Sequence, residues 1–166
     1  MPADAGPPAA SQDGPTPRDG VVVPLRPRRR AAARGLPVHM PKGPLGFPDH
    51  HDFLLADVAD PVLAQFKLLR SVEDRGPVLI VTPIPETSRP IADEDLMEIA
   101  GTAGIPFDEA VFLLVVTVRP KPDGDGMAMS VNLRAPIVLD PARRLARQCV
   151  SPNARYRVQH PFFGWT

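Results

Sequence analysis

Short apolar runs cut by turn residues dominate the C-terminal part of the chain, and they predict strands. Apolar and polar positions alternate over Met129–Arg134, the period of a strand with one buried face. An apolar run, Ile137–Leu139, follows; Asp140–Arg143 contains a proline-directed turn, and Leu145–Val150 runs back. Alternation resumes over Arg155–Gln159. We therefore expect four short strands joined by tight turns as an antiparallel meander.

Further strands are expected upstream of this segment. Short ones are indicated at Val38–Met40, Phe53–Leu55 and Phe66–Val72. Two continuous apolar runs, Pro77–Val81 and Phe112–Val118, have the length and composition of central strands.

One helix signal interrupts this pattern. Asp93–Ala100 begins with acidic residues, which the helix dipole favours in a first turn; Asp93 is the expected N-cap, and Gly101 or Gly104 the expected end. Asp123–Gly126 predicts a hairpin turn. About eight short strands with one short helix indicate an all-β fold, a small antiparallel β-barrel-like domain.

The first 35 residues differ in composition. Eleven of the 23 prolines lie in residues 1–48, and residues 1–35 have no periodic apolar pattern. Such a segment buries too little apolar surface to offset the entropy of ordering it. We expect a disordered Pro/Arg-rich tail over residues 1–35 and a folded domain over residues 36–166. The basic cluster Arg26–Arg30 in this tail is either a solvated linker or a contact to RNA or acidic lipid.

The net charge of zero is a sum of unequal parts. Residues 1–48 carry 7 Lys/Arg and 3 Asp (+4), residues 49–125 carry 6 Lys/Arg and 15 Asp/Glu (−9), and residues 126–166 carry 6 Arg and 1 Asp (+5). An acidic middle disfavours nucleic-acid binding there, because phosphate contacts need cations. It favours a basic protein partner.

The chain lacks a recognisable catalytic or cofactor motif. There is neither a nucleophile elbow nor a phosphate-binding glycine loop, so we expect no enzyme and no cofactor. Asp49–Asp52 contains two adjacent histidines that point to opposite faces of a strand, which favours a polar loop over a metal site. A hairpin turn explains Asp123–Gly126 better than a calcium loop does. The single cysteine, Cys149, permits no internal disulfide and is expected to be buried.

The expected location is the cytoplasm. The first twenty residues contain no apolar signal-peptide core, and no apolar run reaches ~18 residues, so no membrane segment is predicted.

Four segments resemble the FliW family of flagellar assembly factors. Asn132–Leu139 resembles its N-L-x-A-P-I-V-I/L strand pair, and Tyr156–Phe163 its Y-x-V-x-H-P-L/F-F ending. Met40–Phe47 resembles its F-P-x-G-L-x-G-F segment, and Leu69–Asp74 its L-Q-S-x-x-D strand end. The four segments occur in the family's order, and the resemblance covers Leu36–Phe163.

This resemblance implies a compact β-barrel-like fold and a non-enzymatic regulatory role. It implies two protein partners, flagellin and a CsrA-like translational regulator, with relief of CsrA repression of flagellin translation. The alternative is a small β-barrel RNA-binding module, which would need exposed aromatic side chains for base stacking.

The candidate partner-binding residues lie in two acidic clusters. The turn after Leu69–Ser71 and the expected helix start both present carboxylates, whose alternative roles are turn solvation and helix capping. Arg70 stands where the family has glutamine and places a cation beside the first cluster. The candidates are Arg70, Glu73, Asp74, Asp93, Glu94 and Asp95.

Overall fold

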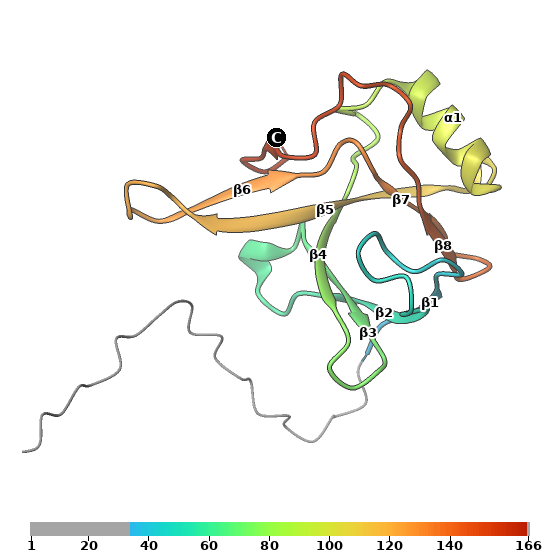
Figure 1. Ribbon diagram of the computed structural model, residues 1–166, viewed down its shortest axis with the longest axis horizontal. Helices are drawn as coiled ribbons and strands as arrows, with labels where there is room; N and C mark the ends of the chain where they lie inside the picture. Colours follow the sequence, from blue (N-terminus) through green and yellow to red (C-terminus); the bar gives the residue numbers. More distant parts are fainter. Residues whose placement is uncertain (1–33, 166) are drawn as a thin grey trace, which may run out of the picture. The chain divides into compact units, whose positions relative to one another are not determined.

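The computed structural model describes residues 34–165, in which nine strands, one α-helix and two short 3₁₀ helices follow one another (Figure 1). The strands are β1 (Leu36–His39), β2 (Asp52–Asp57), β3 (Lys67–Ser71), β4 (Val78–Pro83), β5 (Val111–Pro120), β6 (Met127–Val131), β7 (Ile137–Asp140), β8 (Leu145–Gln148) and β9 (His160–Pro161). The helices are α1 (Asp93–Ala103), η1 (Pro61–Leu63) and η2 (Phe107–Glu109). The predicted tail, residues 1–35, lies outside the described residues except for its last two.

Seven of the strands close into a barrel. The hydrogen-bonded order is β4-β3-β2-β1-β8-β7-β5, and β5 pairs again with β4, with Val81 opposite Val115. A closed sheet leaves no unpaired edge around the ring. Strands β6 and β9 extend the sheet outward from β5. The predicted all-β, barrel-like domain with one helix is confirmed.

The pairing of β5 differs from the expected meander. β5 is ten residues long, so one of its edges pairs first with β7, at Val111–Leu113, and then with β6, at Val116–Pro120. β6 and β7 therefore both pair with β5 and are not neighbours in the sheet. Between them, the Asn132 side-chain oxygen accepts hydrogen bonds from the amides of Arg134 and Ala135, both at 3.0 Å, which turns the chain from one stretch of β5 to the other.

The predicted strand over Arg155–Gln159 is wrong, because the described segment forms turns there and only His160–Pro161 pairs with β6. Its alternating pattern belongs to a loop that contacts the rest of the domain only at certain residues. Tyr156 is buried, and the carbonyl of Arg157 accepts a hydrogen bond from Leu133 N at 3.0 Å.

The barrel wall separates two apolar cores. Ile137 and Leu139 of β7 point into a cluster inside the barrel, while Val138 between them belongs to a second cluster outside it. On β5, Leu113 faces the inner cluster and Leu114 the outer one. Because both faces of these strands are buried, their sequences read as continuous apolar runs.

Helix α1 covers the outer cluster with four buried side chains, Leu96, Ile99, Ala100 and Ala103. Its N-cap is Ala92, which makes no side-chain cap, so the prediction of Asp93 as the cap is wrong. Asp93 is instead the first residue within the helix. Gly104, at a left-handed φ of 72°, ends the helix as predicted.

The seam between β1 and β8 is the narrowest in the ring. The two strands run parallel and meet at a single register pair, His39 and Leu145. His39 N donates to the carbonyl of Arg144 at 2.8 Å. The loop after β1 adds one contact, from Leu45 N to the side-chain oxygen of Gln148 at 2.8 Å.

Candidate partner-binding surfaces

The turn between β3 and β4 presents Glu73 and Asp74 to solvent from a fixed backbone. Ser71 is buried, and its amide donates to the carbonyl of Pro77 at 2.9 Å. Its hydroxyl oxygen accepts a hydrogen bond from Glu73 N at 3.2 Å. A Cβ at Gly76 would lie 2.3 Å from this hydroxyl oxygen, so the tight packing of the turn requires glycine there.

The two carboxylates of this turn have different surroundings. Glu73 Oε2 lies 3.2 Å from His50 Nδ1, whereas Asp74 makes no ion pair with any described residue. Arg70, at the exposed end of β3, and Arg75, at a left-handed φ of 63°, flank the pair along the chain. The turn therefore presents both signs of charge, with Asp74 the carboxylate most available to a partner.

The acidic residues at the start of α1 are unequally available. Asp93 forms an ion pair with Arg89, at 2.7 Å from Oδ1 to the guanidinium. Glu94 is exposed and forms no ion pair within the described part of the chain. Asp95 is largely covered, with 17% of its side chain exposed.

Asp95 joins the start of α1 to the C-terminal loop. Its Oδ2 accepts hydrogen bonds from the Tyr156 hydroxyl at 2.5 Å and from Arg155 at 2.8 Å, and Asn153 approaches at 3.4 Å. The same hydroxyl oxygen accepts from Ala92 N at 3.0 Å. The hydrogen bond from Tyr156, followed by those of Asn153 and Arg155 and the charge of Arg155, lowers the pKa of Asp95 despite the opposing effect of partial burial. Sequence reasoning missed this cluster because its partners are some 60 positions apart.

The structure does not bring the two acidic groups together. In Figure 1 the β3–β4 turn lies at the bottom of the barrel and α1 at the upper right. They are therefore two separate candidate surfaces, and a partner can bind one of them without contacting the other.

The histidines and acidic turns identified as candidate metal ligands have ordinary partners. His39 Nδ1 lies 2.8 Å from Asp52, and His51 Nδ1 lies 3.0 Å from the carbonyl of Met40. Within residues 34–165, no three His, Cys, Asp or Glu side chains gather in a way that would hold a metal ion. The predicted hairpin turn joins β5 to β6, and Asp123 accepts a hydrogen bond from Asp125 N at 3.1 Å.

Two further expectations have structural outcomes. Cys149 is buried, as predicted, directly after β8, and burial raises the pKa of its thiol. Helix α1, with eleven residues and an acidic first turn, falls short of a membrane span, as does every other helix of the described chain.

Comparisons with known proteins agree with this architecture. The family described as FliW protein matches residues 30–162. The flagellar assembly factor FliW of Geotalea uraniireducens is 36% identical over 135 residues, covering 78% of this chain and 76% of the relative. The flagellar assembly factor FliW of Geobacter sulfurreducens is 33% identical over 130 residues, covering 76% of each chain.

A solved structure supports the fold independently. The crystal structure of the flagellar assembly factor FliW superimposes with a TM-score of 0.56 at 21% identity, covering 78% of this chain and 86% of that one. The match of the family over most of the barrel domain, together with relatives above 30% identity, shows that this chain belongs to the FliW family.

Proposed function

We propose that this protein is a cytoplasmic, non-enzymatic flagellar assembly factor that binds a CsrA-like translational regulator and flagellin. By binding the regulator it relieves repression of flagellin translation. Membership of the FliW family and the names of the relatives support the role in flagellar assembly. The two partners are those that the sequence resemblance implies.

The exposed carboxylates of the β3–β4 turn are the observation that carries the regulator-binding part of this proposal. Glu73 and Asp74 project from a turn whose backbone is fixed by Ser71 and Gly76. They lie in the stretch of residues 49–125, with 6 basic and 15 acidic side chains. An RNA-binding regulator is basic where it contacts phosphate, so its field complements this surface. Arg70 adds a cation that selects for a mixed-charge partner surface.

An RNA-binding module has less support. Tyr156 is buried, and its hydroxyl is committed to Asp95. Trp165 is half-buried, packs edge-on against Phe162 with ring centres 5.0 Å apart, and donates its indole N–H to Thr82 at 2.8 Å. Among the described Phe, Tyr and Trp side chains only Phe163 is more than half exposed, and one ring is too few to stack a row of bases.

The decisive experiment measures binding kinetics of the full chain against the purified CsrA homologue and flagellin of the same cell, at two salt concentrations. The double variant Glu73→Lys/Asp74→Lys should lower the association rate for the regulator by about tenfold at low salt, with a smaller effect at high salt. The control Glu86→Lys/Asp108→Lys makes the same change in net charge at exposed carboxylates elsewhere, and its rate should stay close to wild type.

Three results would count against the proposal. Absence of micromolar binding to either protein contradicts the function itself. Equal loss in the control variant shows that net charge, not the turn, drives association. Unchanged binding in the turn variant, with loss in Glu94→Lys, moves the contact to the start of α1.

A further inference from the structure

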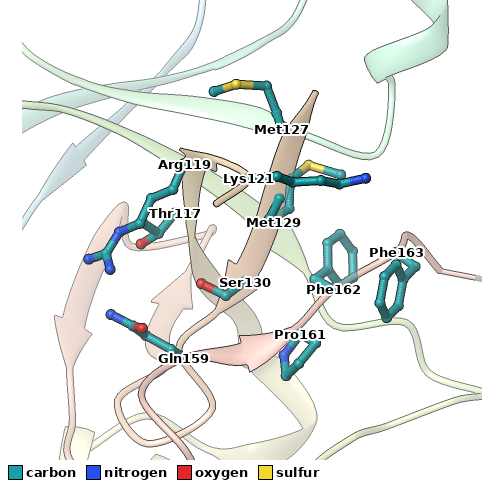
Figure 2. A pocket seen from close by; sticks show the side chains of 11 residues that line it. Thr117, Arg119, Lys121, Met127, Met129, Ser130, Gln159, Pro161, Phe162 and Phe163 are labelled. Carbon is teal, nitrogen blue, oxygen red and sulfur yellow. The ribbon is translucent and has the colours of Figure 1, made fainter. Parts of the chain in front are cut away.

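The β5–β6 hairpin continues beyond the closed part of the barrel and has one uncovered face. In Figure 1 it extends to the left, away from the strands of the ring. Pairing between β4 and β5 ends at Val116, whereas pairing between β5 and β6 continues to Pro120. With β9 on the other side of β6, the hairpin forms a three-stranded sheet whose outer face lines a groove of about 500 Å³ (Figure 2).

Small side chains on the middle strand make this groove. Ala128 lies opposite Arg119, and Ser130 lies between Thr117 and Pro161. Because adjacent strands are ~4.8 Å apart, the rows of side chains on β5 and β9 stand about 10 Å from each other across the small residues of β6. An α-helix with its side chains is about 10–12 Å wide and cannot descend between these rows, whereas an extended chain can.

The groove combines two cations with an apolar side. Arg119 lies on β5 and Lys121 directly after its end; in Figure 2 the Lys121 amine points to the side of Phe162 and Phe163, and the Arg119 guanidinium points the other way. Pro161 and Phe163 form the apolar side, and 93% of Phe163 is exposed. Figure 2 shows Arg119 on one side of β6 and Phe163 on the other.

The cations of this groove are not neutralised within the described chain. None of the side chains that line the groove is a carboxylate, and neither Arg119 nor Lys121 forms an ion pair with any residue from 34 to 165. With its amide oxygen turned toward Arg119, Gln159 accepts hydrogen bonds from the guanidinium at 3.2 and 3.3 Å. A carboxylate would bind the same group more strongly, because it would bring an opposite charge to these hydrogen bonds.

We propose that this groove binds an extended acidic–apolar peptide segment of a protein partner. Carboxylates of the segment pair with Arg119 on one side of β6 and with Lys121 on the other, and an apolar residue packs against Phe163. The N-terminal segment of this chain does not fit, because Arg26–Arg30 would bring like charge to Arg119 and Lys121. Two cations and one exposed ring are fewer than a single-stranded RNA track needs. The site is separate from the acidic turn and stands even if that turn binds no regulator.

The test selects ligands from a random twelve-residue peptide phage library on the immobilised full chain, with counter-selection on Arg119→Glu/Lys121→Glu. The expected consensus combines Asp or Glu with an aliphatic or aromatic residue. The best synthetic peptide should bind at least about tenfold more weakly to the counter-selection variant. It should also bind more weakly to Phe163→Ala. The control Arg34→Glu/Arg144→Glu, an equal charge change at two exposed arginines without ion pairs in the described chain, should bind it within about twofold of wild type.

Folding and location are checked on the same samples. Circular dichroism should show wild-type melting for all three variants, since the changed side chains are exposed. Amide resonances of residues in β6 and around Phe163 should shift on adding the peptide. Failure to enrich an acidic–apolar consensus, or equal binding by Arg119→Glu/Lys121→Glu, overturns the proposal. So does tighter binding of oligouridine than of the peptide, or a dimer that dissociates in that variant, which would assign the groove to RNA or to a second copy.

Discussion

The two halves of β5 have opposite surroundings although they are one continuous strand. From Val111 to Val116 the strand is part of the closed ring, and from Phe112 onward its side chains alternate between the two apolar cores. From Thr117 to Pro120 it pairs only with β6, and its outer face is open to solvent. The first half therefore stabilises the fold. The second half extends from this rigid part of the strand and presents an exposed face that packs against no core. Substitutions in the first half of β5, or in the strands paired with it, should affect folding. Substitutions in the second half should affect binding.

The strongest test of this difference places the same charge in each region. Ile137→Asp, beside β5 inside the barrel, buries a carboxylate where no partner exists. The cost is roughly 5 kcal/mol, comparable with the whole free energy of unfolding of a small domain. Ser130→Asp, on the open face of β6, should cost less than ~1 kcal/mol. Chemical denaturation of both variants checks this, and equal damage would contradict the assignment of the two faces.

A milder version compares two apolar truncations within β5. Leu114→Ala removes a fully buried side chain from the outer core and should lower the free energy of unfolding by about 2–5 kcal/mol. Val118, in the open half, is 38% exposed, and Val118→Ala should lower it by about 0.5 kcal/mol. The measurement is the urea midpoint at constant m-value. A loss from Val118→Ala that is larger than the loss from Leu114→Ala would show that the open half of β5 is part of the core.

A third prediction concerns the link between the C-terminal loop and α1, outside β5. Tyr156→Phe removes the hydroxyl that joins Asp95 to Ala92 and should cost about 1–2 kcal/mol at neutral pH. Because the folded-state pKa of Asp95 is lowered, its contribution to stability is complete above the unfolded pKa and is lost as pH falls through the folded one. Wild-type protein should therefore lose more stability below about pH 4 than Asp95→Asn does. Thermal melts from pH 7 to pH 3 check this; parallel curves for the two proteins would rule it out.

Local pattern was enough to predict most elements of this fold. The apolar runs in β5 and β7 predict strands because those strands are buried on both faces. Gly104 predicts the end of α1 because glycine readily adopts the left-handed conformation found there. Pairing was predicted less well. Of the expected meander, the antiparallel pair of β7 and β8 is confirmed. The pairing of β6 with β7 is wrong, because β5 is long enough to take both strands in succession on one edge.

The candidate site shows the same division between local and distant information. Glu73 and Asp74 were expected in an exposed turn, which is where they lie. No local signal reveals that Asp95 is held by Tyr156, or that Arg119 and Phe163 line one groove from opposite sides of β6. These relations join residues 40 to 60 positions apart and follow only from how β9 and the C-terminal loop return to the barrel.

The narrow seam between β1 and β8 gives the barrel a preferred place to open. Every other junction in the ring is held by at least three register pairs, and this one by the single pair of His39 and Leu145. Sub-global opening in proteins follows the boundaries that cost least to break. A ring parted here becomes an open sheet with β1 and β8 as its two free edges, and such edges are templates for pairing with other chains. A single backbone junction thus separates a closed ring from a sheet that can exchange strands with neighbouring molecules.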